Sequence, residues 1–530
     1  MAGEAPLDER VRAAEVIGAL CLATDLGMGL AFEHGLGSTL IAMRLAERLG
    51  VGGDTASQTY YASLLAHCGC TTDAWVAAEV FGGALTTHLV PVIFGTPRQQ
   101  FAGILGALPS PGSAAPARAM QTVRRLPKAA RLHKPQLAAM CDVAQTLSAQ
   151  LGLPRAVQEL FVDLTERWDG KGVLGRAERE AVPLALRITH VAQDAAVQRM
   201  LVGEERAVRI VGERAGHAFD PEIASCLVDD ASAILAVDPE RSAWEETLAR
   251  EPRPRLSLEG EAIDRALAAM GAFSDLISPH LSGHCAGVAE LATAAARRCR
   301  VEPQEVAALG RAAFVHDIGR VAVAAAIWQK PGPLTADEWE QVRLHPYQTE
   351  RVLSRSPFLA ALAPVAEAHH ERLDRSGYHR GAAAAELSLP ARLLAAADVY
   401  HAMTEPRPHR AALTPEQAAN VLADEVRDGR LDADPAGAVI EAAGQHVPRL
   451  ERPAGLTERE TEVVGLLARG LQTKQIARAL GISVKTADRH IQNAYGKAGV
   501  STRAAATLFA MEHGLVAWGE LPIGRRGLRS

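Results

Sequence analysis

Histidines and aspartates gather between His280 and Asp398 in a pattern that suits a metal centre. The chain has 18 histidines, and six of those in this stretch combine with two aspartates as ligand candidates: His280, His284, His316, His345, His369 and His370, with Asp317 and Asp398. Imidazole and carboxylate together suit hard-to-borderline transition metals. No cysteine stands at a matching position, which argues against a closed structural zinc site.

The segments around these candidates are predicted to be helical, over residues 287–298, 304–315, 335–355 and 389–403. The candidates therefore fall near helix ends or on inner faces of a bundle, where helical proteins build metal centres. A lone histidine on an apolar helix is more often a satisfied core residue. The prediction of a metal centre therefore depends on the ordered series and not on any one histidine.

Five local motifs occur in order along this stretch: VHDIGR (315–320), KPGPLTADEW (330–339), HHERLDRSGYHRG (369–381), ARLLAAADVYHAMT (391–404) and RPHR (407–410). Together they resemble the HD-GYP branch of the HD-domain metal-dependent phosphohydrolases, over roughly residues 273–444. The resemblance implies an all-helical fold that holds two transition-metal ions, iron or manganese. It also implies hydrolysis of cyclic di-GMP or a related cyclic dinucleotide.

The same resemblance implies roles for single residues. Asp317 would bridge two ions in a metal-assisted hydrolysis, as catalytic residue and ligand. Arg320 and Arg407 would hold the substrate phosphate, and Tyr378 would contact the substrate from its loop. A third ion depends on His280, which stands where some members have a carboxylate and others a non-ligand aromatic.

Two positions depart from the family pattern. Arg320 replaces the usual lysine; it keeps the charge but cannot release a proton. His379 replaces the proline of the Gly-Tyr-Pro motif. An alternative therefore stays open, in which this lobe is a non-catalytic sensor of a nucleotide or metal that controls a transcription factor. The complete ligand set favours hydrolysis.

Composition indicates an all-α protein with several domains. The chain has 530 residues, 48% hydrophobic but only 4% aromatic, which is typical of Ala- and Leu-rich helices. No apolar run reaches the roughly 18 residues that cross a membrane. The seven cysteines form no CxxC motif, and no disulfide framework is predicted. We expect a cytoplasmic protein without membrane contact.

The first half of the chain resembles a second HD-GYP-like lobe without its ligands. His34 aligns with His284, and the aligned segments then place Cys68 on Asp317, Leu164-Thr165 on His369-His370, and Gln193 on Asp398. Too few ligands remain there to hold two metals. We expect a degenerate lobe over residues 1–240 that acts as a scaffold, dimerisation surface or ligand sensor. A charged linker, roughly residues 238–258, would lead to the phosphohydrolase domain at residues 259–446.

The C-terminal segment, residues 452–530, reads as four short helices. Thr457 with Glu460 is a capping box that opens the first, which ends near Gly470. The others are expected over residues 473–480, 484–498 and 502–513, with Ser483 capping the third. From Gly455 onward, eight Arg and three Lys against five Glu and one Asp give a net charge of +5. The whole chain has a net charge of −6, so the residues before Gly455 carry −11. A basic tail on an acidic body indicates a polyanionic partner.

The third of these helices has two distinct faces. Val484, Ala487, Ile491 and Ala494 are predicted to face inward, while the opposite face carries Lys485, Thr486, Arg489, His490, Asn493 and Lys497. Such side chains suit base edges and phosphates in the major groove. Residues 455–516 closely resemble the DNA-binding domain of LuxR-type regulators, which implies double-stranded DNA as partner and a homodimer. The predicted architecture is two HD-domain-like lobes in tandem plus a LuxR-type helix-turn-helix domain, in a bacterial transcriptional regulator.

Overall fold

The computed structural model describes residues 10–71, 80–81, 88–110, 112–237, 241–448, 450 and 452–516. Within these ranges the protein is helical, which confirms the all-α prediction. Among the described residues, the named strands are limited to one antiparallel ribbon of β1 (Arg10–Arg12) and β2 (Ser257–Glu259), in which Val11 faces Leu258. Among the described helices, none is both long and apolar enough to cross a membrane.

The chain forms two compact units, and each is interrupted in sequence. The first unit comprises residues 1–282, 318–334 and 351–361, and the second comprises residues 283–317, 335–350 and 362–530. The α-helices of the first unit are α1 (Ala13–Met28), α2 (His34–Arg48), α3 (Gly53–Leu65), α6 (Pro97–Ala107), α7 (Ala115–Gln150), α8 (Arg155–Gln158), α9 (Leu184–Val202), α10 (Glu204–Glu213), α11 (Pro221–Asp229), α12 (Ala231–Ile234), α13 (Ala243–Ala249), α14 (Glu261–Asp275), α17 (Ala325–Trp328) and α20 (Pro357–Ala360). Its 3-10 helices are η1 (Cys68–Thr71), η2 (Val90–Val92), η3 (Glu159–Asp163), η4 (Arg179–Ala181), η5 (Pro279–Leu281) and η6 (Ile318–Ala322).

The first unit is built around α1, which is buried on every face from Ala13 to Asp25 except at Glu15. A helix that is apolar on all sides is stable only inside a core. The segment predicted as a linker differs from expectation here. Residues 243–249 of this segment form α13, and residues 257–258 belong to β2. Residues 238–240 lie outside the described ranges.

The second unit carries most of the predicted ligands. Its α-helices are α15 (His284–Arg298), α16 (Pro303–Val315), α18 (Ala336–Arg343), α21 (Ala363–Ala366), α22 (Leu389–Thr404), α23 (Pro415–Arg427), α24 (Ala433–Ala442), α25 (Glu458–Ala468), α26 (Thr473–Ala479), α27 (Val484–Ala498) and α28 (Arg503–Glu512), and α19 (His345–Leu353) begins in it. Its 3-10 helices are η7 (Glu367–His370), η8 (Ala384–Glu386) and η9 (Pro453–Gly455).

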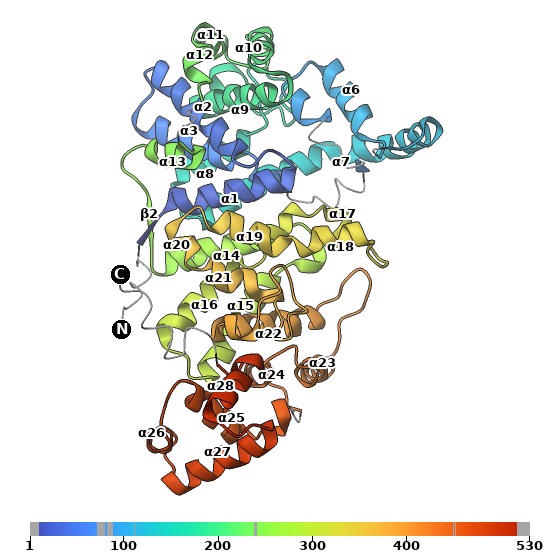
Figure 1. Ribbon diagram of the computed structural model, residues 1–530. Helices are drawn as coiled ribbons and strands as arrows, with labels where there is room; N and C mark the ends of the chain where they lie inside the picture. The colour runs from blue at the N-terminus through green and yellow to red at the C-terminus, as the bar shows by residue number, and fades with distance from the viewer. Residues whose placement is uncertain are drawn as a thin grey trace. The chain divides into compact units, whose positions relative to one another are not determined.

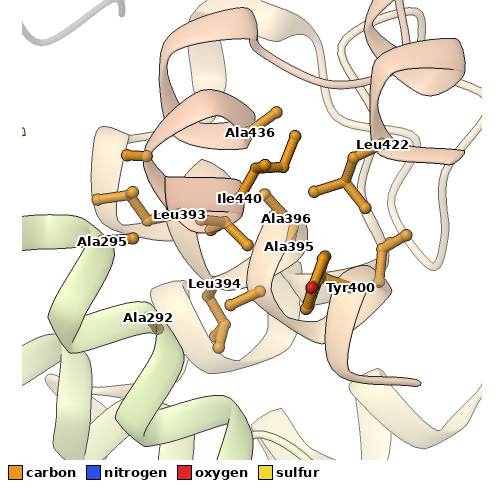
Figure 2. Packing of buried hydrophobic residues seen from close by; sticks show 14 of the residues in the cluster. Ala292, Ala295, Leu393, Leu394, Ala395, Ala396, Tyr400, Leu422, Ala436 and Ile440 are labelled. Atoms are coloured by element: carbon orange, nitrogen blue, oxygen red, sulfur yellow. The ribbon is translucent and has the colours of Figure 1, made fainter. Parts of the chain in front are cut away.

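An alanine-rich core holds α15 against α22. Ala292 and Ala295 of α15 pack with Leu393 and Leu394 of α22, and α23 and α24 add Leu422, Ala436 and Ile440 (Figure 2). Alanine leaves little side chain between two helices, so their backbones lie close together. The packing brings His284, at the start of α15, near Asp398 on α22.

The helix predicted over residues 335–355 is wrong in one respect, because it breaks at Leu344 into α18 and α19. Pro346 has no N–H and cannot complete a helical bond to the carbonyl of Val342. The Nδ1 of His345 donates to that carbonyl instead, at 2.6 Å. The break therefore places His345 at a helix start with its ring orientation fixed.

Candidate metal centre and helix-turn-helix

Seven of the eight predicted metal ligands converge in the second unit. They come from the start of α15, the end of α16, the start of α19, η7 and α22. Six of these side chains belong to nearly inaccessible residues: His284, His316, Asp317 and His369 are 0% exposed, His345 is 1% exposed and Asp398 is 2% exposed. His370 is half-buried. Burying so many polar groups together is unfavourable unless they share a counter-charge.

The two carboxylate oxygens of Asp317 face two different groups of histidines. Oδ1 lies 3.3 Å from Nε2 of His345 and 3.4 Å from Nε2 of His369. Oδ2 lies 3.1 Å from Nε2 of His316 and 3.5 Å from Nε2 of His284. A carboxylate that turns one oxygen toward each of two ligand groups has the geometry of a bridge between two cations.

Asp398 completes the group of ligands near Oδ2 of Asp317. Its Oδ1 lies 3.1 Å from Nε2 of His284 and 3.8 Å from Nε2 of His316, while its Oδ2 lies 3.8 Å from Nδ1 of His370. The donor atoms of His284, His316 and Asp398 all lie within 4.8 Å of one another, as do those of His345, His369 and His370. The described residues thus offer one donor group on each side of Asp317.

Backbone carbonyls fix the tautomers of three of these rings. Nδ1 of His316 donates to Ala313 at 2.6 Å, and Nδ1 of His369 donates to Ala366 at 2.6 Å, as His345 does to Val342. A carbonyl only accepts, so each Nδ1 carries a hydrogen and each Nε2 lies toward Asp317. The Nε2 of His316 is buried without a hydrogen-bond partner. This donor set fits transition-metal ions, whose histidine ligands are oriented in this way.

The electrostatics of the cluster favour a cation. Burial lowers the pKa of His369 to about 4 despite Asp317, so its ring is neutral at pH 7. Burial raises the pKa of Asp398, but the hydrogen bond from His284 and the nearby rings of His316 and His370 outweigh burial and hold the pKa well below its usual range. Burial also lowers the pKa of His316, yet Asp317 and Asp398 raise it to about 10. The field that holds a proton on His316 would equally hold a metal ion, which displaces that proton on binding.

Sequence reasoning missed Glu405 and His401. Nδ1 of His284 donates to Oε2 of Glu405 at 2.9 Å, and Nδ1 of His401 lies 3.4 Å from Oε1. A carboxylate behind a ligand histidine fixes the ring and raises its basicity. Burial raises the pKa of Glu405, but the hydrogen bonds of His284 and His401 lower it to about 2. The available signal was weak: Glu405 follows His401 by one helical turn and precedes Arg407 by two residues.

Of the residues predicted to bind substrate, Tyr378 and Arg407 lie in the same unit as the metal ligands, and Arg320 does not. The ring centroid of Tyr378 lies 4.7 Å from that of His370. The backbone N–H of Tyr378 donates to the backbone carbonyl of His370 at 3.2 Å. Gly377 permits this loop, because a Cβ there would lie 2.5 Å from the same carbonyl oxygen. Arg407 pairs with Glu405 at 2.7 Å. His280 and Arg320 belong to the first unit, so their roles at this centre stay predictions.

Residues 457–513 form the four helices predicted for them, α25 to α28 (Figure 1). Both bonds of the Thr457–Glu460 capping box are present, and Ser483 caps α27. Ala487, Ile491 and Ala494 are buried as predicted. The inward placement of Val484 is wrong, because this residue is 46% exposed. Val484 is the first residue of α27, and side chains of a helix lean toward its N-terminus, which here is the solvent-exposed end.

The predicted DNA-contacting face of α27 is mostly accessible. Lys485, Arg489 and Asn493 are exposed, while Thr486 and His490 are half-buried. The ammonium of Lys497 is already paired, at 2.6 Å from Oε2 of Glu460 and 3.1 Å from the Gly455 carbonyl. Lys497 therefore also ties α27 to the start of α25.

Comparison with known families gives the chain two domain assignments. Residues 272–434 match the HD domain family, and residues 454–510 match the luxR family of bacterial regulatory proteins. The chain therefore carries an HD domain followed by a LuxR-type helix-turn-helix domain.

Two relatives and one solved structure illustrate the similarity. A 3′3′-cGAMP-specific phosphodiesterase of Vibrio cholerae is 29% identical over 416 residues, which cover 77% of this chain and 90% of that protein. A cyclic di-GMP phosphodiesterase of Pseudomonas aeruginosa is 33% identical over 232 residues, 44% of this chain and 49% of that protein. A crystal structure of a cyclic GMP-AMP specific phosphodiesterase of V. cholerae aligns with a TM-score of 0.56 at 25% identity, covering 82% of this chain and 98% of that one.

Proposed function

We propose that this chain is a metal-dependent phosphodiesterase for cyclic dinucleotides that is fused to a DNA-binding domain. The observation that carries the proposal is the orientation of Asp317, whose two oxygens face separate histidine groups at 3.1–3.5 Å. The similarity to phosphodiesterases of V. cholerae and P. aeruginosa supports the substrate class. Cyclic di-GMP and 3′3′-cGAMP are the two leading candidates.

The residues of the site are proposed to have separate roles in metal binding and substrate binding. Two ions, iron or manganese, would activate a water molecule and neutralise the phosphate charge when bound. The histidines, Asp317 and Asp398 would hold these ions, and Glu405 keeps His284 in its orientation through the hydrogen bond from Nδ1. Tyr378 presents its ring beside His370 for contact with the substrate. Arg407 would bind the phosphate through its guanidinium fork, and the same role for Arg320 stays a prediction from the sequence.

The chain is proposed to have three domains, at residues 1–240, 259–446 and 452–530. The first is proposed to be a duplicated HD lobe that has lost its metal ligands. The helix bounds support duplication, because α2 and α15 are each 15 residues long and start 250 positions apart. The following helices, α3 and α16, are each 13 residues long and show the same offset. Similarity to the V. cholerae relative covers 416 residues and thus extends well beyond the HD domain match. A role as scaffold, dimerisation surface or ligand sensor follows from its missing ligands.

The C-terminal domain is proposed to bind double-stranded DNA as a homodimer. The exposed side of α27 offers Lys485, Arg489 and Asn493, and its buried side packs on α25 and α26. Insertion of such a helix into the major groove is how helix-turn-helix domains read DNA.

Hydrolysis of cyclic di-GMP and 3′3′-cGAMP by full-length protein reconstituted with Mn²⁺ or Fe²⁺ tests the enzymatic proposal. Asp317→Ala should abolish turnover, because the bridging carboxylate is lost. Cys68→Ala, at the equivalent position of the first lobe, should retain nearly full activity. Equal loss in both variants, or no turnover by metal-loaded wild type, would overturn the assignment.

A second candidate function is a non-catalytic sensor of a nucleotide or metal. The observation that favours it is Arg407, which Glu405 holds at 2.7 Å while also binding His284. A phosphate would have to compete for that guanidinium. Tight binding of a cyclic dinucleotide by metal-loaded wild type, with no product after prolonged incubation, would support the sensor.

A further inference from the structure

A second group of ligand-type side chains lies beside the Tyr378 loop and shares no residue with the centre around Asp317. Glu350 lies on α19, Glu367 begins η7, and His379 directly follows Tyr378. One donor atom from each of the three lies within 4.8 Å of those of the other two. An imidazole and two carboxylates are a common ligand set for divalent transition metals.

Arg380 neutralises this cluster only in part. Its Nη2 lies 2.8 Å from Oε1 of Glu350 and 3.0 Å from Oε1 of Glu367. The other oxygen of Glu367, Oε2, is buried without a hydrogen-bond partner in a residue that is 6% exposed. Oε2 of Glu350 lies 3.9 Å from Nε2 of His379, beyond hydrogen-bond distance. Both carboxylates therefore pair with the half-exposed Arg380 side chain, and Oε2 of Glu367 has no hydrogen-bond partner.

His379 also has unused capacity for a ligand. Its Nδ1 is buried without a hydrogen-bond partner. Glu371 holds the backbone that follows His379, since its carboxylate accepts from the N–H of Arg380 and of Ala382, both at 2.8 Å. Glu371 is itself 3% exposed. The loop that carries His379 is therefore anchored before any ligand binds.

We propose that Glu350, Glu367 and His379 form a separate site for a divalent transition-metal ion such as Zn²⁺ or Mn²⁺. Bonds of about 2.1 Å in a tetrahedral arrangement place ligand atoms about 3.4 Å apart, so side-chain shifts of roughly 1 Å would close the site. A bound ion would connect η7, which carries His369 and His370, to the loop that carries Tyr378. Arg380 competes with the ion for both carboxylates.

Metal binding by full-length protein tests this site independently of the proposed hydrolysis. Asp317→Ala serves as the background, because it disables the main centre. Equilibrium dialysis against Zn²⁺ with elemental analysis should find one ion fewer per chain in Asp317→Ala/Glu367→Gln than in Asp317→Ala. The same loss is expected for Asp317→Ala/His379→Ala. Asp317→Ala/Glu340→Gln, which changes an exposed glutamate of α18, should keep the ion.

Arg380→Ala in the same background separates a metal site from a plain ion-pair network. Removing the competing cation should tighten Zn²⁺ binding at least several-fold if a metal site exists. Unchanged or weaker binding, or equal stoichiometry in the Glu367→Gln and Glu340→Gln variants, overturns the site. Glu350→Gln provides a second variant if Glu367→Gln lowers the melting temperature. A different result would separate the two proposals. If Asp317→Ala bound as many ions as wild type, but Glu367→Gln still removed one, the proposed hydrolase would be contradicted and this site would remain.

Discussion

The Nε2 atoms of His345 and His369 lie 3.1 Å apart, and each ring gives its Nδ1 hydrogen to a backbone carbonyl. When both rings are neutral, two lone pairs face each other across this distance. Oδ1 of Asp317 lies 3.3–3.4 Å from the same two atoms. A cation shared by these three atoms would stabilise the arrangement, and the spacing suits two imidazoles on one metal ion.

Glu405→Gln tests whether the carboxylate behind His284 supports metal binding. The substitution keeps the size but removes the charge that orients and polarises the ring. Metal affinity should fall by about 10–100-fold. Competition with a chelating indicator dye would measure the change.

Arg407→Ala is the matched control for Glu405→Gln. It removes the other partner of the same carboxylate and leaves the His284–Glu405 bond in place. Its metal affinity should stay within about twofold of wild type, while turnover of a cyclic dinucleotide falls. Equal metal loss in both variants would show that the pair acts only as a structural unit.

Asp25 should make the first lobe less stable as pH rises. This residue of α1 is 1% exposed and accepts the Gly35 N–H at 3.1 Å. Burial, opposed by the Gly35 and His34 N–H groups and aided by Glu33, raises its pKa to about 8. A folded-state pKa above the unfolded one gives stability that is complete below about pH 4 and is lost as pH rises through about 8.

Asp25→Asn should flatten this dependence. The melting temperature of wild type, measured by calorimetry, should drop more between about pH 5 and pH 8 than that of Asp25→Asn. Parallel curves for the two proteins would contradict the raised pKa. Because the charge of Glu33 also raises the pKa of Asp25, Glu33→Gln measures the contribution of Glu33 separately.

The local elements could be predicted from sequence better than the contacts. The start of α25 followed from Thr457 and Glu460, and that of α27 from Ser483, because capping depends on residues three positions apart. The break before His345 was missed although Pro346 signals it. Glu405 was missed because its contact with His284 spans 121 positions. The division of Asp317 between two histidine groups depends on how several helices pack, which no local pattern contains.

Arg489→Ala should weaken DNA binding by the full-length protein. Arg489 is exposed on α27, and the loss should be about 1–3 kcal/mol on a cognate site if it reads a base. A loss of similar size on every sequence would indicate a phosphate contact. Wild-type affinity should fall steeply with salt, since phosphate contacts release counterions. Fluorescence anisotropy over a salt series would measure both effects.

Lys497→Ala is the matched control on the same helix. Because Glu460 holds the Lys497 ammonium at 2.6 Å, this change should lower the stability of the C-terminal domain more than its DNA affinity. If wild type shows no salt-sensitive binding to any genomic DNA pool, the DNA-binding proposal fails.

Elemental analysis of full-length protein purified without chelators tests the two-ion centre most directly. Wild type should carry at least two transition-metal ions per chain, because the donors divide into two groups around Asp317. Asp317→Ala should lose at least one of them, and Cys68→Ala should lose none. Wild-type protein with less than one ion per chain, or an unchanged metal content in Asp317→Ala, would contradict the proposed centre.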